Sequence, residues 1–258
     1  MAFVEQSTDG RLATITITRP EALNAISGDV ADEIAAAFRA AAGNGSVWTV
    51  VLAAAGDRAF CVGADLKERN TLDDEGWARN RVRMRELFEA IRDCPVPTIA
   101  SVFGFALGGG FELALSCDLI VASEDAVFGL PETTVGIVPG GGGTQLLARK
   151  IGLARAKELI FTGRRLPVEE AHEWGLVARV APRGELASAT ADLAGRILAA
   201  SPVAVREAKS AMDGGFGIPL QDALELEDAA WRRAIASDDR REGVAAFNEK
   251  RGPGWTGR

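Results

Sequence analysis

The stretch Ala106-Leu107-Gly108-Gly109-Gly110-Phe111-Glu112 joins an apolar strand expected over residues 98–103 to an apolar helix expected over residues 111–116. Three successive glycines carry no side chain, so strand and helix can meet in a tight turn. Taken without the rest of the sequence, the glycine triplet would be explained by this tight turn. The same bare main chain could also point an N–H group at a ligand oxygen where the helix begins. Glu112 then lies among apolar residues, where a buried carboxylate requires a partner or a function.

Hydrophobic patterns on either side of this stretch predict alternating strands and helices. Residues 12–18 alternate apolar and polar side chains, as in a half-buried strand, whereas residues 47–55 are continuously apolar, as in a strand buried on both faces. Further strands are expected over residues 60–62, 98–103 and 119–122, and helices over residues 30–42, 73–92 and 111–116. This alternation predicts an α/β core whose Gly-rich turns gather on one side.

The last quarter of the chain shows no strand pattern. Helices are expected there over residues 185–200, 202–212, 219–237 and 238–250, separated by helix-breaking and capping residues. We therefore expect a catalytic core over residues 1–195 and a helical region over residues 196–258. Since about 60 residues of helix seldom fold alone, this region should pack on the core or on a neighbouring subunit.

The composition argues against several classes of protein. A net charge of −7 and a pI near 5.0 argue against a nucleic-acid-binding protein, because such proteins present a basic face. Cys61, Cys94 and Cys117 are isolated and His172 is the single histidine, which disfavours zinc sites and Ser-His-Asp or Cys-His catalysis. No apolar run reaches the length of a membrane-spanning helix, and no signal-peptide pattern is present. We expect a cytoplasmic protein without a metal.

Two carboxylates and two small-residue turns form the candidate chemistry. Glu132 lies between apolar residues in a second loop, so it pairs with Glu112 as a candidate acid and base, with a solvated loop carboxylate as the alternative. The turn Gly63-Ala64-Asp65 could add a second N–H donor for an oxyanion. Residues 140–145 are rich in glycine but lack the Lys-Ser/Thr ending of a nucleotide phosphate loop, which argues against nucleotide hydrolysis.

Five motifs resemble the crotonase family, also called the enoyl-CoA hydratase/isomerase family, in their order and spacing. They are Arg19-Pro20-Glu21-Ala22-Leu23-Asn24-Ala25, Phe60-Cys61-Val62-Gly63-Ala64-Asp65-Leu66-Lys67-Glu68, residues 104–118, Pro131-Glu132 with Gly136-Ile137-Val138-Pro139-Gly140, and Asp238-Asp239-Arg240-Arg241-Glu242-Gly243 with Phe247. The resemblance implies a spiral of ββα units with a C-terminal helical trimerisation region. It also implies trimers or dimers of trimers, an acyl-CoA thioester substrate, and no metal or separate cofactor.

The resemblance assigns roles to individual residues. It places the two oxyanion-hole N–H groups on Ala64 and Gly109 and the two catalytic glutamates at Glu112 and Glu132. Because many members of the family lack one or both acids, this pair implies an enoyl-CoA hydratase that adds water across the C2=C3 bond, as in fatty-acid β-oxidation. Substrate and CoA contacts are implied for Ala22, Leu23, Ala25, Val62, Gly63, Asp65, Leu66, Lys67, Phe105, Gly108, Pro131 and Gly140.

Several alternatives remain within this resemblance. Segments such as residues 63–69 resemble methylglutaconyl-CoA hydratases of leucine degradation, some of which also bind RNA, although the acidic net charge argues against RNA. Residues 249–258 also resemble carnitinyl-CoA dehydratases. An isomerase would need only Glu132, and a CoA-ester binder would need neither acid. The acyl pocket should include parts of residues 70–85 and Phe105, and an arginine or lysine reaching into it would favour a carboxylated acyl group.

Overall fold

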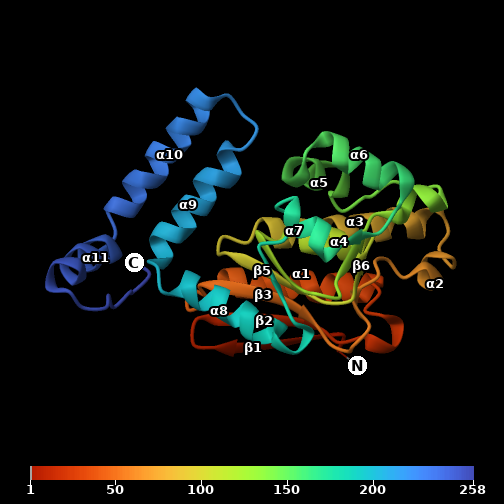
Figure 1. Cartoon of the computed structure of the whole chain (residues 1–258), viewed down its shortest axis with the longest axis horizontal. Helices are drawn as coiled ribbons and strands as arrows, with labels where there is room; N and C mark the ends of the chain where they lie inside the picture. The colour runs from red at the N-terminus through yellow and green to blue at the C-terminus, as the bar shows by residue number, and fades with distance from the viewer. Residues whose placement is uncertain (1) are drawn as a thin grey trace.

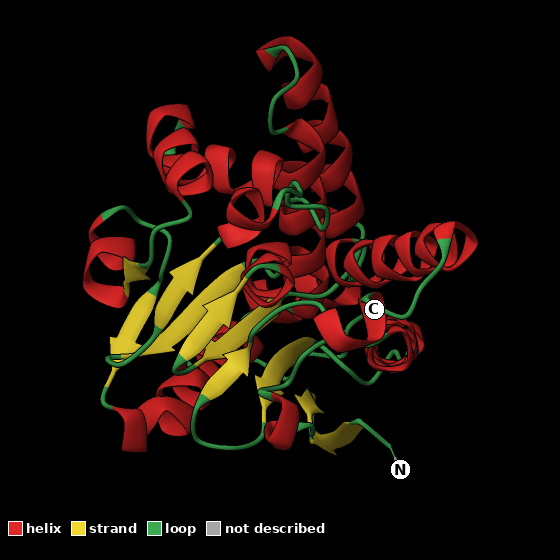
Figure 2. Cartoon of the chain, turned by 90° about the vertical axis from the view of Figure 1, so that its right-hand side faces the viewer, coloured by secondary structure: helices red, strands yellow, loops and turns green. Residues whose placement is uncertain are grey.

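Two β-sheets form the centre of the computed structural model, which describes residues 2–258 (Figure 1, Figure 2). The larger sheet has the strand order β1 (Val4–Asp9), β2 (Leu12–Ile17), β3 (Thr49–Ala54), β5 (Thr98–Val102), β7 (Leu119–Ser123) and β10 (Arg179–Ala181). The smaller sheet has the order β4 (Ala59–Cys61), β6 (Phe105–Leu107), β8 (Val127–Gly129) and β9 (Leu166–Pro167). Neighbouring strands are parallel except for the antiparallel pairs β1–β2 and β8–β9.

The chain passes through both sheets in three successive turns, each made of a strand of the larger sheet, a short strand of the smaller sheet and a helical segment. The first turn is β3, β4, α2 (Leu66–Arg69) and α3 (Asp74–Arg92); the second is β5, β6 and α4 (Gly109–Ser116); the third is β7, β8, the 3-10 helix η2 (Pro131–Val135), α5 (Gly143–Ile151) and α6 (Leu153–Thr162). This is the expected spiral of ββα units. Because β4, β6 and β8 are parallel neighbours, the segments that follow them start at one edge of the smaller sheet.

Helices cover both faces of the larger sheet (Figure 2). Successive side chains of a strand point to opposite faces, and β3 shows this directly. Val50 and Leu52 belong to the main core, which includes the buried face of α1 (Gly28–Gly43), whereas Val51 packs in a second cluster with α8 (Leu186–Leu198). Ser27 caps α1 by accepting a hydrogen bond from the N–H of Val30 at 3.3 Å. The sheet is therefore buried on both sides, as its continuous apolar strands require.

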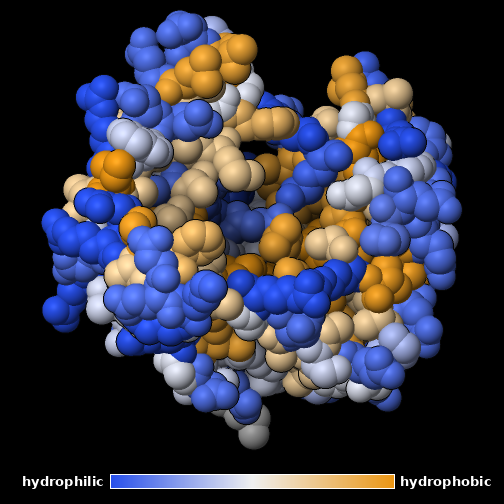
Figure 3. Space-filling view, turned by 60° about the vertical axis from the view of Figure 1, so that its left-hand side comes forward, coloured by the Kyte–Doolittle hydropathy of each residue, from blue (hydrophilic) through white to orange (hydrophobic). Residues whose placement is uncertain are grey.

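The last three helices form an arm that stands away from the sheets (Figure 1). They are α9 (Pro202–Gly215), α10 (Leu220–Ile235) and α11 (Asp238–Glu249). The arm exposes large apolar side chains, namely Met212, Phe216, Ile218, Leu220, Leu224, Leu226, Trp231, Val244 and Phe247. The face that carries the arm is hollowed, and apolar side chains lie around the hollow (Figure 3). The expected division at residue 195 falls near the end of α8, and the division itself stays a prediction.

Most expected elements are present, with ends displaced by up to three residues. The short polar helix around His172 is α7 (Val168–Glu173), and Nδ1 of His172 lies 2.8 Å from the carbonyl oxygen of Val177, which gives this ring a structural role. The elements that the hydrophobic pattern did not predict are β1, β6, β8, β9, β10, α5 and α6. Four of these five strands have only two or three residues, too few to show a period of two.

Candidate active site

Two main-chain N–H groups lie close together where the first and second turns meet. Ala64 follows β4, and Gly109 is the first residue of α4. A methyl group added to Gly63 would lie 2.9 Å from the nitrogen of Gly109, and one added to Gly109 would lie 3.7 Å from the nitrogen of Ala64. The first N–H of a helix has no acceptor within that helix. Both N–H groups border the same cavity and can serve one ligand oxygen.

The glycine triplet makes this close approach geometrically feasible. Gly108 has φ 52° and ψ −127°, a conformation that residues with a Cβ rarely adopt. A methyl group on Gly110 would lie only 2.0 Å from the carbonyl oxygen of Cys61, because α4 is pressed against β4 there. The structural explanation and the functional explanation of the triplet are thus compatible, since the tight turn is what brings the N–H of Gly109 to the cavity.

Glu112 lies one turn into α4 and is almost fully buried, with 3% of its surface exposed. The N–H groups of Gly141 and Gly143 donate to its Oε1 at 2.7 and 2.8 Å. Burial raises the pKa of Glu112, while these two N–H groups and the more distant arginines Arg81 and Arg69 oppose that rise. The two donors fix one carboxylate oxygen, which leaves the other available to a reacting group.

The loop that holds Glu112 is itself held by two arginines of α3. Nη1 of Arg81 donates to the carbonyl oxygen of Gly140 at 2.6 Å, and Nη1 of Arg92 donates to that of Gly141 at 3.2 Å. The roles of these two arginines in holding the loop could not be predicted from the sequence. An arginine on an amphipathic helix is ordinarily solvated, and nothing in the sequence indicates that two main-chain carbonyls face this helix.

Glu132 comes from the third turn, at the second residue of η2, and 9% of its surface is exposed. Its Oε2 is buried and makes no hydrogen bond within residues 2–258. Its Oε1 lies beside the main chain of Gly108, since a methyl group there would be 3.2 Å away. Burial, reinforced by the charge of Glu112 and opposed by Arg69, raises the pKa of Glu132 to about 7. A pKa near neutrality suits Glu132 to act as a proton donor.

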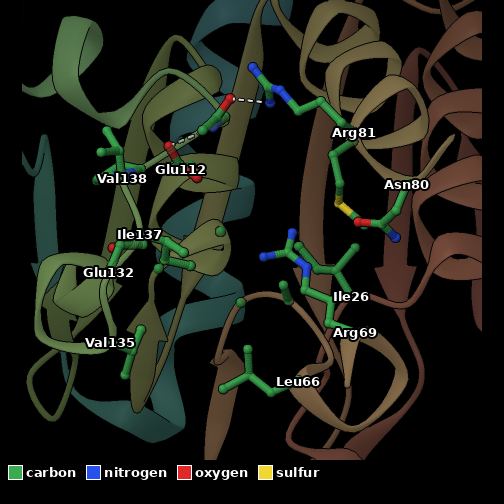
Figure 4. Close-up of a pocket in the computed structure, with 18 of the residues that line it drawn as sticks. Ile26, Leu66, Arg69, Asn80, Arg81, Glu112, Glu132, Val135, Ile137 and Val138 are labelled. Atoms are coloured by element: carbon green, nitrogen blue, oxygen red, sulfur yellow. Dashed lines mark hydrogen bonds between the residues drawn. The ribbon is translucent and has the colours of Figure 1, made fainter. Parts of the chain in front are cut away.

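A cavity of about 510 Å³ brings these groups together (Figure 4). Of the residues predicted from the sequence, it is lined by Val62, Gly63, Ala64, Leu66, Gly108, Gly109, Glu112, Pro131, Glu132 and Gly140. The expected wall over residues 70–85 contributes Trp77, Asn80, Arg81 and Met84. Lining residues that the sequence analysis did not identify include Arg69, Ile26, Val135, Ile137 and Val138. In Figure 4, Arg69 and Arg81 extend from the side opposite Glu132 and Val138.

The other predicted residues lie outside this cavity. Asp65 accepts from Lys67 and Glu68 N–H as the cap of α2 and forms an ion pair with Arg19 at 2.7 Å. Phe105 is partly exposed, with the guanidinium of Arg165 over its ring. Ala22, Leu23, Ala25 and Lys67 are also not among the lining residues. Their contacts with CoA stay predictions.

Comparison with known proteins places the chain in a family. A family model described as Enoyl-CoA hydratase/isomerase matches residues 7–258. The chain belongs to the enoyl-CoA hydratase/isomerase family. The resemblance found in the sequence is thereby confirmed, and so is the crotonase fold that it implied.

Several similar members of the enoyl-CoA hydratase/isomerase family are named as hydratases. The short-chain-enoyl-CoA hydratase of Clostridium acetobutylicum is 40% identical over 249 residues, which cover 94% of this chain and 93% of the relative. The mitochondrial methylglutaconyl-CoA hydratase of Mus musculus is 40% identical over 250 residues, covering 95% and 80%. A crystal structure of the enoyl-CoA hydratase from Bacillus anthracis matches with a TM-score of 0.97 and 39% identity over 100% of both chains. The chain is an enzyme of the hydratase type.

Residues 2–258 of this family member contain no group of three His, Cys, Asp or Glu side chains arranged to hold a metal ion. Burial raises the pKa of the Cys61 thiol to about 12 and raises that of Cys117 as well, so neither thiol is a ready nucleophile at neutral pH. None of the helices in the described part of the chain is both long and apolar enough to span a membrane.

Proposed function

We propose that this enzyme adds water across the C2=C3 bond of a 2-enoyl-CoA thioester to give a 3-hydroxyacyl-CoA. The observation that carries the proposal is the pair of acids at one cavity, with Glu112 fixed by two N–H groups and Glu132 carrying a raised pKa. Hydration needs both, because the water loses a proton while carbon 2 gains one. Two carboxyl groups whose environments differ can divide these roles.

The N–H groups of Ala64 and Gly109 are proposed to donate to the thioester carbonyl oxygen. Negative charge develops on this oxygen as water adds to carbon 3, so donors that already point at it stabilise the transition state more than the substrate. The positive end of α4 adds to the field at Gly109. Loss of one such donor typically lowers kcat by about 100- to 1000-fold.

Glu112 is proposed as the base and Glu132 as the acid. Glu112 takes a proton from the water as the water oxygen bonds to carbon 3. The electron pair of the double bond moves toward carbon 2 and the carbonyl, and carbon 2 then takes the proton of Glu132. One water is consumed, and a net proton transfer from Glu112 to Glu132 restores the starting state. This assignment follows from Glu132 having the raised pKa of about 7 that suits a proton donor.

A double-bond isomerase is the second candidate, and it is less well supported. Such a reaction moves a proton between two carbons and needs one acid, so the two donors that fix Glu112 would serve no purpose. A carnitinyl-CoA dehydratase would use the same acid pair in reverse and differs only in its acyl group. RNA binding has the net charge of −7 against it.

The CoA part of the substrate is proposed to lie along residues 22–25 and α2. Leu23 and Asn24 have φ values of 52° and 55°, which non-glycine residues adopt only when their surroundings impose it. The side-chain amide of Asn24 donates to the carbonyl oxygens of Ala55 and Ala59 at 2.9 Å each and so ties this turn to the segment around β4. Lys67, exposed on α2, is proposed to meet a CoA phosphate. The mechanism requires no cofactor beyond the CoA of the substrate.

A trimer or a dimer of trimers is proposed as the assembled state, in a reducing cytoplasm. The support is the arm of α9, α10 and α11, whose apolar side chains are exposed in the single chain. Exposed apolar patches of this kind commonly mark contacts between subunits.

The test is hydration of crotonyl-CoA by purified Glu112→Gln and Glu132→Gln, followed by loss of the absorbance of the conjugated thioester. Each variant is expected to lose at least about 100-fold in kcat, the usual contribution of a positioned acid or base, while binding of unreactive butyryl-CoA is retained. Glu75→Gln, on the exposed surface of α3, is the matched control and should retain full activity. Near-normal turnover by either active-site variant would refute the assignment.

A further inference from the structure

Arg69, a charged residue that the proposed mechanism does not use, also lines the cavity. Arg69 is the last residue of α2, the short helix that begins directly after Ala64 and is capped by Asp65. Its N–H donates to the carbonyl oxygen of Asp65 at 3.0 Å, so the position of the residue is set by the same turn that positions the N–H of Ala64. Arg69 and Arg81 both line the cavity and extend into it (Figure 4).

The guanidinium of Arg69 is held in place but not neutralised. It lies over the ring of Trp77, with 5.3 Å between Cζ and the ring centroid. Its Nε is buried and has no hydrogen-bond partner within residues 2–258. Burial lowers the pKa of Arg69, and the charges of Glu112, Glu68 and Glu132 oppose this without any of them reaching it as an ion pair. A buried donor without a partner is costly and calls for an explanation.

The balance of charge in the cavity also favours an anion. Glu112 and Glu132 face Arg69 and Arg81 across it. When Glu132 is protonated, as its proposed role as acid requires, two guanidinium groups face one carboxylate. The side chains that line the cavity then carry an excess of one positive charge, while Glu68, whose charge also acts on Arg69, lies outside the lining.

We propose that the acyl group of the substrate carries a second carboxylate at the end remote from the thioester, and that Arg69 binds it, with Arg81 adding to the positive field. The inference rests on the proposed hydration and specifies its substrate class. Arginine suits this task because its planar donors match a carboxylate. Met84, Ile137 and Val138 also line the cavity and offer apolar surface for the intervening carbons.

A plain alkyl substrate fits these residues less well. Its apolar end would lie against the guanidinium of Arg69 without offering it an acceptor. Sites built to form a hydrogen bond discriminate strongly against analogues that lack it. A rival explanation is that Arg69 acts only on the ionisation of Glu112 and Glu132. The two explanations differ in one respect: an effect on the acids would alter all substrates equally, whereas carboxylate binding would alter one class.

The experiment compares glutaconyl-CoA, a five-carbon 2-enoyl thioester with a terminal carboxylate, with crotonyl-CoA. The wild-type enzyme should show a kcat/KM at least about 10-fold higher for glutaconyl-CoA, the usual effect of a hydrogen bond to a charged group. Arg69→Met should lower that ratio by at least about 10-fold, and Arg69→Lys should restore part of it. Arg79→Met is the matched control, since Arg79 is exposed on α3 and paired with Glu75.

Binding of unreactive analogues separates this inference from the hydration itself. Calorimetry should show tighter binding of glutaryl-CoA than of butyryl-CoA to the wild type, and equal binding to Arg69→Met. The inference is overturned if the wild type does not distinguish the two analogues, or if Arg69→Met lowers kcat/KM equally for both enoyl substrates. Selective binding of glutaryl-CoA without hydration of either enoyl-CoA would refute the proposed function and leave carboxylate recognition standing.

Discussion

Glu132→Gln is expected to stabilise the folded protein at alkaline pH, in addition to lowering kcat by at least about 100-fold. The residue Glu132 is 9% exposed and its buried Oε2 has no hydrogen-bond partner within residues 2–258, so the charged carboxylate is poorly solvated in the folded state. The pKa rises from 4.5 to about 7 on folding for that reason, with burial as the largest cause. The folded protein therefore binds the proton of Glu132 more tightly than the unfolded chain does.

The sign and the size of the effect follow from this difference. Well below pH 4.5 the carboxyl of Glu132 is protonated in both the folded and the unfolded state, so it does not lower the free energy of unfolding. As the pH rises toward 7 the unfolded chain ionises first, so stability falls, and above pH 7 the full cost is present. A rise in pKa from 4.5 to about 7 corresponds to about 3 kcal/mol. A glutamine has no proton to lose over this range and avoids the cost.

Thermal unfolding at pH 5 and pH 8 measures this difference at one protein concentration and one scan rate. For a chain of this length, about 3 kcal/mol corresponds to a change of roughly 6–12 °C in Tm. Glu132→Gln should thus gain several degrees on the wild type between pH 5 and pH 8. Because glutamine also alters the site at pH 5, the change with pH is the informative quantity.

The control is Glu75→Gln, whose side chain is exposed and paired with Arg79 on the surface of α3. Its Tm should follow that of the wild type at both values of pH. A constant difference in Tm between Glu132→Gln and the wild type would refute the reasoning. It would mean that Glu132 ionises alike in the folded and unfolded chains, and its assignment as the proton donor near neutral pH would lose its physical basis.

Three further outcomes are expected. The kcat/KM for hydration should fall about tenfold per pH unit above pH 7 as Glu132 loses its proton; a flat stopped-flow profile to pH 9 would contradict this. Gly110→Ala should lower stability to urea by about 1–3 kcal/mol or more, because its methyl group would lie 2.0 Å from the oxygen of Cys61. Gly195→Ala, with open space around it in α8, should be neutral or stabilising; equal unfolding of both variants would contradict this expectation. Phe247→Asp should reduce the mass found by light scattering, since the 83% exposed ring is expected to lie between subunits; a monomeric wild type would contradict this.

The long elements could be predicted from the sequence because each carries its own signal. The alternating pattern over residues 12–18 depends on neighbours within a few positions, and the structure has this segment as β2 (Leu12–Ile17). The smaller sheet was largely missed because its strands have two or three residues and are specified by pairing across three turns of the chain. Such pairing leaves no local period in the sequence.

The site shows the same division. Glu112 could be singled out because a carboxylate in an apolar helix contradicts its surroundings. The contributions of Arg69, Arg81 and Arg92 could not, because an arginine on a polar helix face looks the same whether solvent or a main-chain carbonyl lies opposite. From the sequence, a basic residue in the pocket is expected to favour a carboxylated acyl group, and in the structure Arg69 and Arg81 line the pocket.

The residues proposed to act on the thioester, which every substrate has, and the residues that line the acyl pocket, where substrates differ, come from different parts of the fold. Ala64, Gly109 and Glu132 each follow a strand of this sheet by two or three residues, so one set of strand pairings spaces all three. Arg69 and the lining side chains of α3 belong to the helical segment of the first turn. Changes in these lining side chains can therefore alter the acyl preference while the N–H groups proposed to bind the carbonyl stay in place. Arg81 and Arg92 of α3 must be kept, because they hold the loop that fixes Glu112. A protein engineer can use the same partition, grafting α2 and α3 between relatives as one cassette that retains these two arginines.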